Sequence, residues 1–349
     1  MSFAVTDAVP LRHNTHNEVT GSVDRVTTAD GRSVVRKRLR RPGADPAADP
    51  RWRASDDRTT YLWWRREAEV YADDELRTAL LAAGLSLPPA TVEETAGGAT
   101  LWIDWIDGRT DGALTTADYR TLATALGRWQ ARGVPAALPA WASRGYLRAY
   151  ESTQLRHVER IGALALLDDD EAWRHPLIAD LWPAGLRGRW TALVADRDRL
   201  HRIMTALPRT LCHLDVWAAN VVANDHIALV DWAFAGDGAI GEDIGNAIPD
   251  ACFDLFYPAD QVRDLDTVMT TSYLEGLATA GCDVEPSLVR LGITASCVKY
   301  TWLLPLLLHR AADPEHKAYF QTVDPEPRYR ATGQVFALLT DWHAETQTL

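Results

Sequence analysis

Residues 213–220 read His-Leu-Asp-Val-Trp-Ala-Ala-Asn, and this stretch decides how the rest of the chain is interpreted. An apolar run over 227–230 follows, and directly after it comes Asp231, eleven residues beyond Asn220. The spacing H-x-D-x-x-x-x-N, followed by a strand that ends in Asp, brings two carboxylates and one amide together. Carboxylate and amide oxygens are ligands that Mg²⁺ prefers, usually with several waters retained. The segment therefore predicts a magnesium site beside a carboxylate that can take up a proton.

Each polar residue of this motif has a mechanical role in phosphoryl transfer. We expect Asp215 to accept the proton of an attacking hydroxyl, while Asn220 and Asp231 hold Mg²⁺ against phosphate oxygens. Two residues are expected to support the site without touching the phosphates. His213 would brace its own loop by hydrogen bonds, and Asp243 would hold the loop around Asp231. Together the residues predict a kinase that uses Mg²⁺ and a nucleoside triphosphate, ATP or GTP.

The motif resembles the catalytic loop of the protein-kinase-like superfamily, and most closely its aminoglycoside phosphotransferase and choline kinase branch. In that branch D-W and a Gly-rich G-x-x-x-x-D follow the loop, and here Asp231-Trp232 opens a Gly-rich segment that ends at Asp243. Residues 246–250 also resemble bacterial antibiotic phosphotransferases. The resemblance implies an α+β, bilobal fold. The N-terminal lobe would be an antiparallel sheet plus one helix, and the larger C-terminal lobe mostly helical.

The same resemblance implies a small-molecule kinase that acts on a hydroxyl of an antibiotic, of aminoglycoside or nucleoside type. A primary metabolite, such as a choline-like amine, a sugar or an amino alcohol, is the alternative acceptor. We expect acceptor specificity to come from the second lobe and from the segment after Asp231. Acidic side chains would pair with ammonium groups, and Trp faces would stack on a nucleoside or a sugar. The candidates are Trp217, Trp232, Asp237, Asp250 and Asp254.

Lys37 is the expected phosphate-binding lysine. The chain has 36 Lys and Arg residues but only three lysines, so a retained lysine is informative. Period-two alternation over 33–39 places Lys37 on the face with the apolar residues, which would turn toward the interlobe cleft. It matches the family's strand lysine, which pairs with the α- and β-phosphates. Glu67 matches the family's helix glutamate that orients this lysine, and Glu69, on another helix face, is the alternative.

Two further segments are expected to contact the nucleotide. One is the first hairpin, which has a single Gly instead of G-x-G-x-x-G, so that an ordinary β-turn is an equal interpretation. The other is the stretch 101–108, which resembles the family's lobe connection, where backbone groups read the base edge. The candidates are Thr20, Gly21, Ser22, Asp104 and Ile106.

The length of the 349-residue chain and a change near residue 107, from mostly strand patterns to mostly helix patterns, predict two lobes. We place a nucleotide-binding lobe at 1–106 and a catalytic, acceptor-binding lobe at 107–349. In the first lobe we expect strands over 19–27, 33–39, 91–93 and 100–106, a flexible loop over 40–53 and one helix over 61–81. In the second we expect helices over 115–130, 147–167, 190–207, 288–310 and 333–345.

The composition excludes several classes of protein. A formal net charge of −12 argues against nucleic acid as a partner. Four cysteines without C-x-x-C spacing indicate neither a zinc site nor a disulfide framework. The strongest apolar run, 302–308, is too short to span a membrane, and no signal peptide is visible. We therefore expect a cytoplasmic protein that acts on a small molecule, as a monomer or a homodimer.

Three other classes of function compete with this interpretation. A nucleotide-binding pseudokinase would keep the fold without turnover, but such a site usually loses at least one of the residues above. A protein kinase would carry D-F-G and A-P-E, whereas Asp231-Trp232-Ala233 stands in the first place and no A-P-E follows. A metal-dependent hydrolase would need a second His at ligand spacing. His226 is the nearby candidate, and its position predicts a hairpin loop instead.

Overall fold

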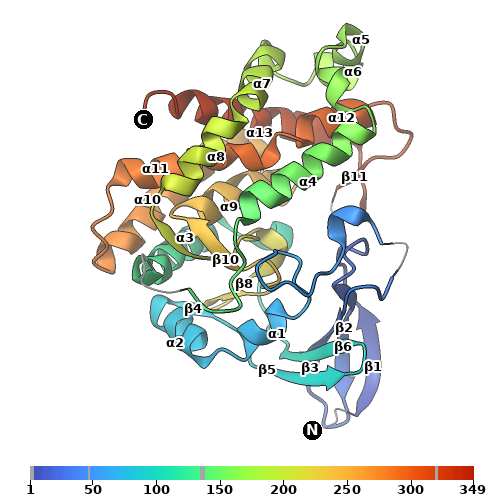
Figure 1. Ribbon diagram of the computed structural model, residues 1–349, viewed down its shortest axis with the longest axis vertical. Helices are drawn as coiled ribbons and strands as arrows, with labels where there is room; N and C mark the ends of the chain where they lie inside the picture. The colour runs from blue at the N-terminus through green and yellow to red at the C-terminus, as the bar shows by residue number, and fades with distance from the viewer. Residues whose placement is uncertain (1–3, 46–47, 134–137, 319–320) are drawn as a thin grey trace.

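The computed structural model describes residues 4–45, 48–133, 138–318 and 321–349. It has an α+β fold with two lobes, as the resemblance implied (Figure 1). In Figure 1 the N-terminal sheet lies at the bottom, and the later helices fill the middle and the top. Between these two parts lie several short strands that carry the functional loops.

The N-terminal sheet has five strands in the order β1-β2-β3-β6-β5, and every neighbouring pair is antiparallel. The strands are β1 (Val5–Pro10), β2 (Thr20–Thr28), β3 (Ser33–Arg40), β5 (Ala90–Thr95) and β6 (Gly98–Asp104). Gly31, with φ of 82°, makes the turn between β2 and β3. Strand β1 was not predicted, because all of its residues are exposed and it therefore lacks an apolar alternation. Lys37 lies on the central strand, opposite Val23 and Leu101.

Residues 61–81 do not form the single helix that was expected. They contribute to two helices, α1 (Arg66–Tyr71) and α2 (Asp74–Ala83). The break lies at Asp73, whose carboxylate accepts the backbone N–H of Leu76 at 2.8 Å and so begins a new helix as its N-cap. The indole of Trp141 donates to the same carboxylate at 2.8 Å, which fixes this break against the second lobe.

Short strands in the middle of the molecule position the predicted motif. They are β4 (Leu85–Ser86), β7 (Arg209–Cys212), β8 (Val221–Ala223), β9 (Ile227–Leu229) and β10 (Gly236–Ala239). β7 pairs with β10, and β9 pairs with both β8 and β4. The loop 213–220 therefore lies between β7 and β8, Asp231 follows β9, and His226 lies in the turn between β8 and β9. The β4–β9 pairing joins the two lobes by backbone hydrogen bonds.

Two long helices form the closest helix pair of the second lobe. They are α3 (Thr116–Gln130) and α10 (Val262–Thr279). Thr115 begins α3 with a capping box that includes Asp118. A Cβ at Gly127 would lie 2.3 Å from the Tyr273 carbonyl oxygen, and a Cβ at Gly276 would lie 2.2 Å from that of Thr124. These two glycines allow the helix backbones to touch.

The other predicted helices are present, but most are interrupted. Residues 147–167 fall in α4 (Tyr146–Arg160) and a short 3₁₀ turn, and 190–207 fall in α7 (Leu186–Ala195) and α8 (Arg197–Ala206). Residues 288–310 form α11 (Pro286–Ala295), a 3₁₀ segment and α12 (Leu303–Arg310). The remaining elements are α5 (Asp170–Trp173), α6 (Pro176–Ala179), α9 (Glu242–Phe253), α13 (Pro325–Glu345), β11 (Lys317–Ala318) and β12 (Gln321–Thr322). The expected loop 40–53 contains a 3₁₀ turn, Pro50–Trp52, and its residues 46 and 47 lie outside the described residues.

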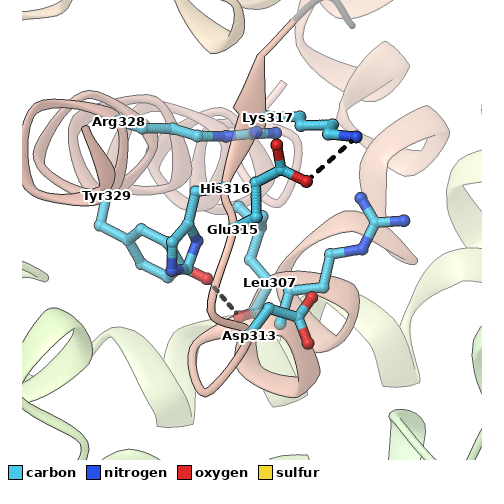
Figure 2. Close-up of a pocket in the computed structure, with 8 residues that line it drawn as sticks. Leu307, Asp313, Glu315, His316, Lys317, Arg328 and Tyr329 are labelled. Carbon is cyan, nitrogen blue, oxygen red and sulfur yellow. Dashed lines mark hydrogen bonds and ion pairs between the residues drawn. The ribbon is translucent and has the colours of Figure 1, made fainter. Parts of the chain in front are cut away.

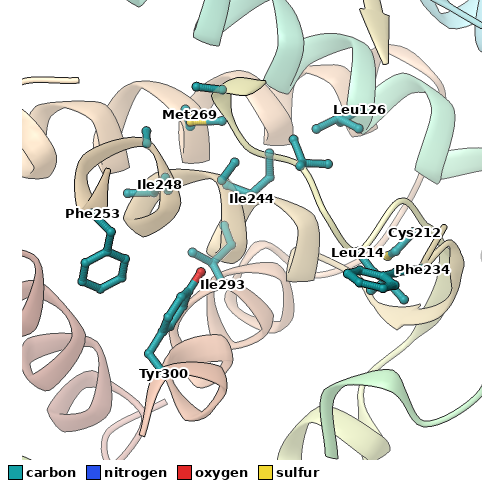
Figure 3. Close-up of a cluster of buried hydrophobic side chains, with 14 of the residues drawn as sticks. Leu126, Cys212, Leu214, Phe234, Ile244, Ile248, Phe253, Met269, Ile293 and Tyr300 are labelled. Atoms are coloured by element: carbon teal, nitrogen blue, oxygen red, sulfur yellow. The ribbon is translucent and has the colours of Figure 1, made fainter. Parts of the chain in front are cut away.

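The core of the second lobe is built around α9 (Figure 3). Ile244 and Ile248 of this helix lie among buried side chains of neighbouring helices, such as Met269 and Ile293. Leu214 of the loop 213–220 belongs to the same core and is fully buried. The stretch Pro286–Arg310 is apolar enough to cross a membrane, but 83% of its most apolar window is buried inside the fold. It is therefore packed as a core segment.

Candidate active site

The loop between β7 and β8 brings Asp215 and Asn220 together. The side-chain Nδ2 of Asn220 donates to the Asp215 carboxylate at 2.9 Å and to its carbonyl oxygen at 3.0 Å. The Asn220 carbonyl accepts the N–H of Val230, just before Asp231, at 3.0 Å. Because the amide nitrogen is used in these bonds, the Asn220 Oδ1 is the atom that can serve as a metal ligand.

His213 is buried and braces this loop through both ring nitrogens. Its Nδ1 accepts the backbone N–H of Asp215 at 3.3 Å. The proton is therefore on Nε2, which donates to the Val230 carbonyl at 3.1 Å. Burial lowers the pKa of His213 to about 4, so the ring is neutral at physiological pH. These contacts fit the bracing role that was predicted for His213 and leave no ring nitrogen for proton transfer.

Asp243 clamps the catalytic loop itself. Its carboxylate accepts the backbone N–H groups of His213 at 2.9 Å and Leu214 at 2.8 Å, and the side-chain amide of Gln130 at 2.7 Å. Leu214 is held at a φ of 66°, a left-handed conformation that is costly for a leucine. These contacts fit the supporting role expected of Asp243, but its bonds go to the loop 213–220 and not directly to the loop around Asp231.

Lys37 joins the two lobes at the predicted metal site. Its ammonium lies 2.7 Å from Glu67 on α1 and 2.8 Å from Asp231 after β9, and the lysine is only 4% exposed. Burial opposes the charged form of Lys37, but the charges of Asp231 and Glu67 outweigh it and raise its pKa. Burial likewise acts to raise the pKa of Asp231, and Lys37 outweighs this effect and lowers it. Glu69 forms an ion pair with Arg65 instead, so Glu67 is the glutamate that contacts Lys37.

Asp215 has the ionisation expected of a group that can exchange a proton near neutral pH. Burial, followed by the negative charge of Asp231, raises the pKa of Asp215 to about 7. Lys299 and the hydrogen bond from Asn220 act in the opposite direction. A pKa near the working pH favours general base catalysis.

The donor set fits a hard divalent cation. Asp231 offers a carboxylate whose Oδ1 is bound by Lys37, and it is presented from a strained backbone with φ of 58°. Asn220 offers its Oδ1, as described above. One carboxylate and one amide suit Mg²⁺, which usually completes its shell with water and phosphate oxygens. The residues expected to bind the metal are thus compatible with that role.

Arg66 holds the site together, and no sequence pattern indicated it. The guanidinium is fully buried, forms no ion pair with any acid in the described part of the chain, and has its pKa lowered by burial to about 9. Its nitrogens donate to five backbone carbonyls between 2.6 and 3.0 Å, those of Arg58, Thr60, Tyr61, Trp141 and Ala233. Arg66 therefore fixes the helix of Glu67, the second lobe and the segment after Asp231 relative to one another. Backbone carbonyls leave no trace in a sequence, which is why this role was missed.

The backbone groups proposed for the nucleotide fit less well. The N–H of Thr20 already donates to the Asn17 carbonyl at 3.2 Å, so Thr20 cannot be a phosphate donor as expected. Gly21 lies at a bulge of β2, and the Ser22 hydroxyl donates to Asp24 at 3.3 Å. In the lobe connection, the N–H of Asp104 donates to the Pro89 carbonyl at 2.9 Å and is not available to a base. The following Ile106 is half-buried.

Most of the acids proposed for a cationic acceptor are already neutralised. Asp237 forms an ion pair with Arg209 at 3.0 Å, and Asp250 forms one with Lys299 at 3.0 Å. Asp254 is the C-cap residue of α9, and its negative charge acts to raise the pKa of Arg328. Asp237 and Asp250 are thus engaged by basic side chains, and their role in binding an acceptor stays a prediction.

The two proposed tryptophans also differ from what was expected. Trp232 is fully buried, donates to the Leu229 carbonyl at 3.0 Å and packs edge-on against His213 and Trp129. It is a core residue that supports the motif, and its assignment to the acceptor was wrong. Trp217 lies on the catalytic loop and is half-buried beside Phe256, with ring centroids 5.7 Å apart, and its contact with an acceptor stays a prediction.

A cluster of aromatic rings, here called the aromatic wall, lies beside Asp215 instead. Tyr146 stacks on Tyr150 and on Phe234, with ring centroids 5.5 Å apart in each pair. Burial raises the pKa of both tyrosines well above its usual value, and the nearby charge of Asp215 adds to the shift. Lys299 lies over the Tyr150 ring at 5.9 Å. The complete wall consists of Trp52, Tyr61, Tyr146, Tyr150 and Phe234.

The fold of the chain is similar to that of several solved structures. The amicoumacin kinase hAmiN, in complex with AMP-PNP, Ca²⁺ and Ami, aligns with a TM-score of 0.55 at 14% identity, covering 95% of this chain and 90% of that one. A choline kinase from Cryptosporidium parvum Iowa II aligns with a TM-score of 0.52 at 12% identity, covering 98% and 90%. An aminoglycoside phosphotransferase from Alicyclobacillus acidocaldarius aligns with a TM-score of 0.51 at 13% identity, covering 100% and 94%. At such identities the likeness establishes the fold alone.

The family match is more specific than the fold. None of the curated proteins matches the chain. The model of the phosphotransferase enzyme family, however, matches residues 21–282, which include Lys37, Glu67, Asp215, Asn220 and Asp231. This match spans most of the sheet and all of the predicted catalytic motif. The chain therefore belongs to the phosphotransferase enzyme family.

Proposed function

We propose that the protein transfers the γ-phosphoryl group of ATP or GTP to a hydroxyl of a small molecule, with Mg²⁺ as cofactor. The observation that carries this proposal is the convergence of Lys37, Glu67 and Asp231 within 2.8 Å from three separate segments. A buried lysine held between two carboxylates is positioned to move onto phosphate oxygens. Asp215, with a pKa of about 7, lies on the loop that also supplies Asn220.

The residues divide the reaction between them. Asp215 takes the proton from the acceptor hydroxyl as its oxygen bonds to the γ-phosphorus. The bond between that phosphorus and the β–γ bridging oxygen breaks, and the nucleoside diphosphate leaves with the electron pair. Lys37 would hold the α- and β-phosphates, and Asn220 and Asp231 would hold Mg²⁺, which neutralises charge on the phosphates. Most of the rate enhancement would come from positioning and electrostatic stabilisation.

The acceptor we propose is an uncharged, ring-bearing antibiotic of nucleoside type. Asp237 and Asp250 are paired with Arg209 and Lys299, so they offer little to the ammonium groups of an aminoglycoside. Of the aromatic wall beside Asp215, Tyr61, Tyr146 and Phe234 are buried, whereas Trp52 and Tyr150 are half-buried and keep part of their rings accessible to a base or sugar ring. An enzyme with this acceptor would act in the cytoplasm, where the triphosphate donor is found.

The test is phosphoryl transfer to a panel of hydroxylated compounds, followed by mass spectrometry. The panel contains nucleoside antibiotics, aminoglycosides, amicoumacin-like and macrolide antibiotics, choline-like amines and sugars, each with Mg²⁺ and either ATP or GTP. We expect the mass gain of one phosphoryl group on a nucleoside-type compound and none with Asp215→Asn. A mass gain on aminoglycosides or choline would overturn the proposed acceptor class and support the proposed kinase activity. Nucleotide binding without any gain would favour a pseudokinase.

A further inference from the structure

A pocket of about 240 Å³ lies in the second lobe, among residues that have no part in the proposed reaction (Figure 2). It is formed by the end of α12, the segment that leads to β11 and the first turns of α13. Leu307 and Tyr329 give it an apolar side, and the Tyr329 hydroxyl donates to the Leu307 carbonyl at 2.8 Å. The rest of the lining is dominated by charged side chains.

Two arginines of this pocket form no ion pair among the described residues, although the charge of Asp254 acts on Arg328. Among the residues that the structure describes, neither Arg310 nor Arg328 forms a side-chain ion pair or hydrogen bond, and the Nε of Arg328 is buried without a partner. Arg310 is exposed and can be solvated, whereas Arg328 is half-buried and its unpaired Nε is shielded from water. Lys317, the third cation of the lining, is already neutralised by Glu315 at 3.3 Å.

The position of Arg328 makes its isolation costly. It lies in the first turns of α13, where the helix dipole is positive and disfavours a cation. Glu326, the acid of that first turn, pairs with Arg330 at 2.8 Å instead. Burial lowers the pKa of Arg328, and Asp254 offsets this only in part. The side chain of Arg328 is half-buried, and its Nε is a buried donor without an acceptor. An unsatisfied buried donor is destabilising, and an anion in the pocket would supply the missing acceptor.

The remaining groups around Arg328 limit what can bind. The ring of His316 packs edge-on against Tyr329, with centroids 5.6 Å apart, and burial together with Arg328 lowers its pKa, so it is neutral. Asp313 lies at the far side of the pocket from Arg328 (Figure 2). An anionic group would therefore approach the Arg328 side, while an apolar body would lie against Leu307 and Tyr329.

We propose that this pocket binds a small organic oxyanion, a carboxylate or a phosphate ester, through Arg328 and Arg310. A guanidinium offers parallel N–H donors that match either oxyanion. The site is separate from the one that contains Asp215, and the proposal does not depend on the reaction proposed above.

The test is thermal unfolding of the full chain with inorganic phosphate, succinate or benzoate, each at the ionic strength of a chloride control. Binding of phosphate at the nucleotide site is recognised by the variants below, because a shift that arises there does not depend on Arg328. We expect a saturable rise in Tm of about 2–5 °C for at least one of these anions. Comparing the Tm shift with phosphate to the shifts with the two carboxylates shows which kind of oxyanion is preferred. Comparing benzoate with succinate tests whether the apolar side of the pocket contributes to binding.

The matched variants are Arg328→Met and Arg330→Met, because both arginines lie on α13 and only the first lines the pocket. Arg328→Met should abolish the anion-dependent rise in Tm, and Arg330→Met should keep it. Arg310→Gln should lower the apparent affinity for the anion about 10-fold. Arg328→Met should also raise Tm in chloride alone, because the uncompensated cation is removed. The proposal is overturned if no anion gives a saturable shift, or if the shift is the same in Arg328→Met. Should that variant fail to fold, the comparison rests on Arg310→Gln and the wild type.

Discussion

The side-chain amide of Asn220 donates a hydrogen bond of 2.9 Å to the carboxylate of Asp215, so the proposed metal ligand and the proposed base hold each other in place. The bond orients the Asn220 oxygen away from Asp215. It also fixes which carboxylate oxygen of Asp215 remains for a substrate hydroxyl. The two functions of the loop are therefore linked in one geometry, and substitutions at either position should be interpreted together.

Replacement of the proposed base should slow the chemical step. Asp215→Asn keeps the size of the side chain but cannot accept the hydroxyl proton. We expect kcat to fall by about 10²–10⁴-fold with little change in the affinity for Mg·nucleotide. Steady-state transfer assays, with nucleotide binding measured by calorimetry, would check this. Activity within a few-fold of wild type would remove Asp215 from the role of base.

Loss of the carboxylate after β9 should abolish turnover through the metal. In Asp231→Ala, Lys37 also loses its 2.8 Å partner, and Mg²⁺ loses its only charged protein ligand in the proposed site. We expect no measurable transfer at any Mg²⁺ concentration that the assay tolerates. Titration of activity against Mg²⁺ is the measurement. Activity that persists and still depends on Mg²⁺ would contradict the assignment of Asp231.

The two glutamates of α1 provide a matched pair. Glu67→Gln removes the charge that lies 2.7 Å from Lys37, whereas Glu69→Gln removes a half-exposed partner of Arg65. We expect Glu67→Gln to lower kcat/KM for the nucleotide about 10–100-fold, the value of a charged hydrogen bond. Glu69→Gln should stay within about two-fold. Equal effects of the two substitutions would show that Glu67 does not orient Lys37.

The pH dependence of the reaction should follow the ionisation of Asp215. Burial and the charge of Asp231 raise its pKa to about 7 in the free protein. Because a base must be deprotonated to act, activity should rise as the pH increases toward 7 and level off above it. A bound Mg²⁺ would lower the pKa, so half-maximal activity should lie at or below about pH 7. A profile of kcat/KM that falls between pH 5 and 7 would not fit this base.

Arg66 should contribute more to the free energy of unfolding than the adjacent Arg65. Arg66→Met leaves five buried carbonyls without their donor, and we expect the free energy of unfolding to fall by more than about 4 kcal/mol. Arg65→Met removes partly exposed ion pairs with Glu69 and Glu94, and should cost less than about 1 kcal/mol. Urea unfolding of the two variants tests the contrast. Similar losses would mean that the Arg66 bonds are replaced by water.

The sequence was informative where chemistry requires a fixed spacing. The loop 213–220 and Asp231 are separated by set numbers of residues because a loop, a hairpin and a strand must bring them to one point. Lys37 could be selected because a strand alternates and because lysine is rare in this chain. The bilobal fold followed from the resemblance carried by these residues.

The features that the sequence did not reveal have a common physical cause. Whether a Trp stacks on a ligand or fills a core depends on its surroundings, and Trp232 turned out to be buried. Whether Asp250 can bind a cation depends on Lys299, which lies 49 residues away in sequence. The single helix over 61–81 was interrupted because Asp73 caps a second one, a local contact that competes with helical periodicity. Long-range neighbours of this kind are fixed by tertiary packing.

The pairing of β4 with β9 has a consequence for how the molecule folds and how it can be divided. The first lobe contributes β4 and the second contributes β8 and β9 to one shared sheet, so either half alone would expose an unpaired backbone edge. The buried guanidinium bonds of Arg66 cross the same boundary and would be broken with it. The two lobes therefore depend on each other for stability, like the halves of one cooperative unit rather than two modules on a linker. A chain cut between them would have to reassemble from both fragments before either became resistant to proteolysis.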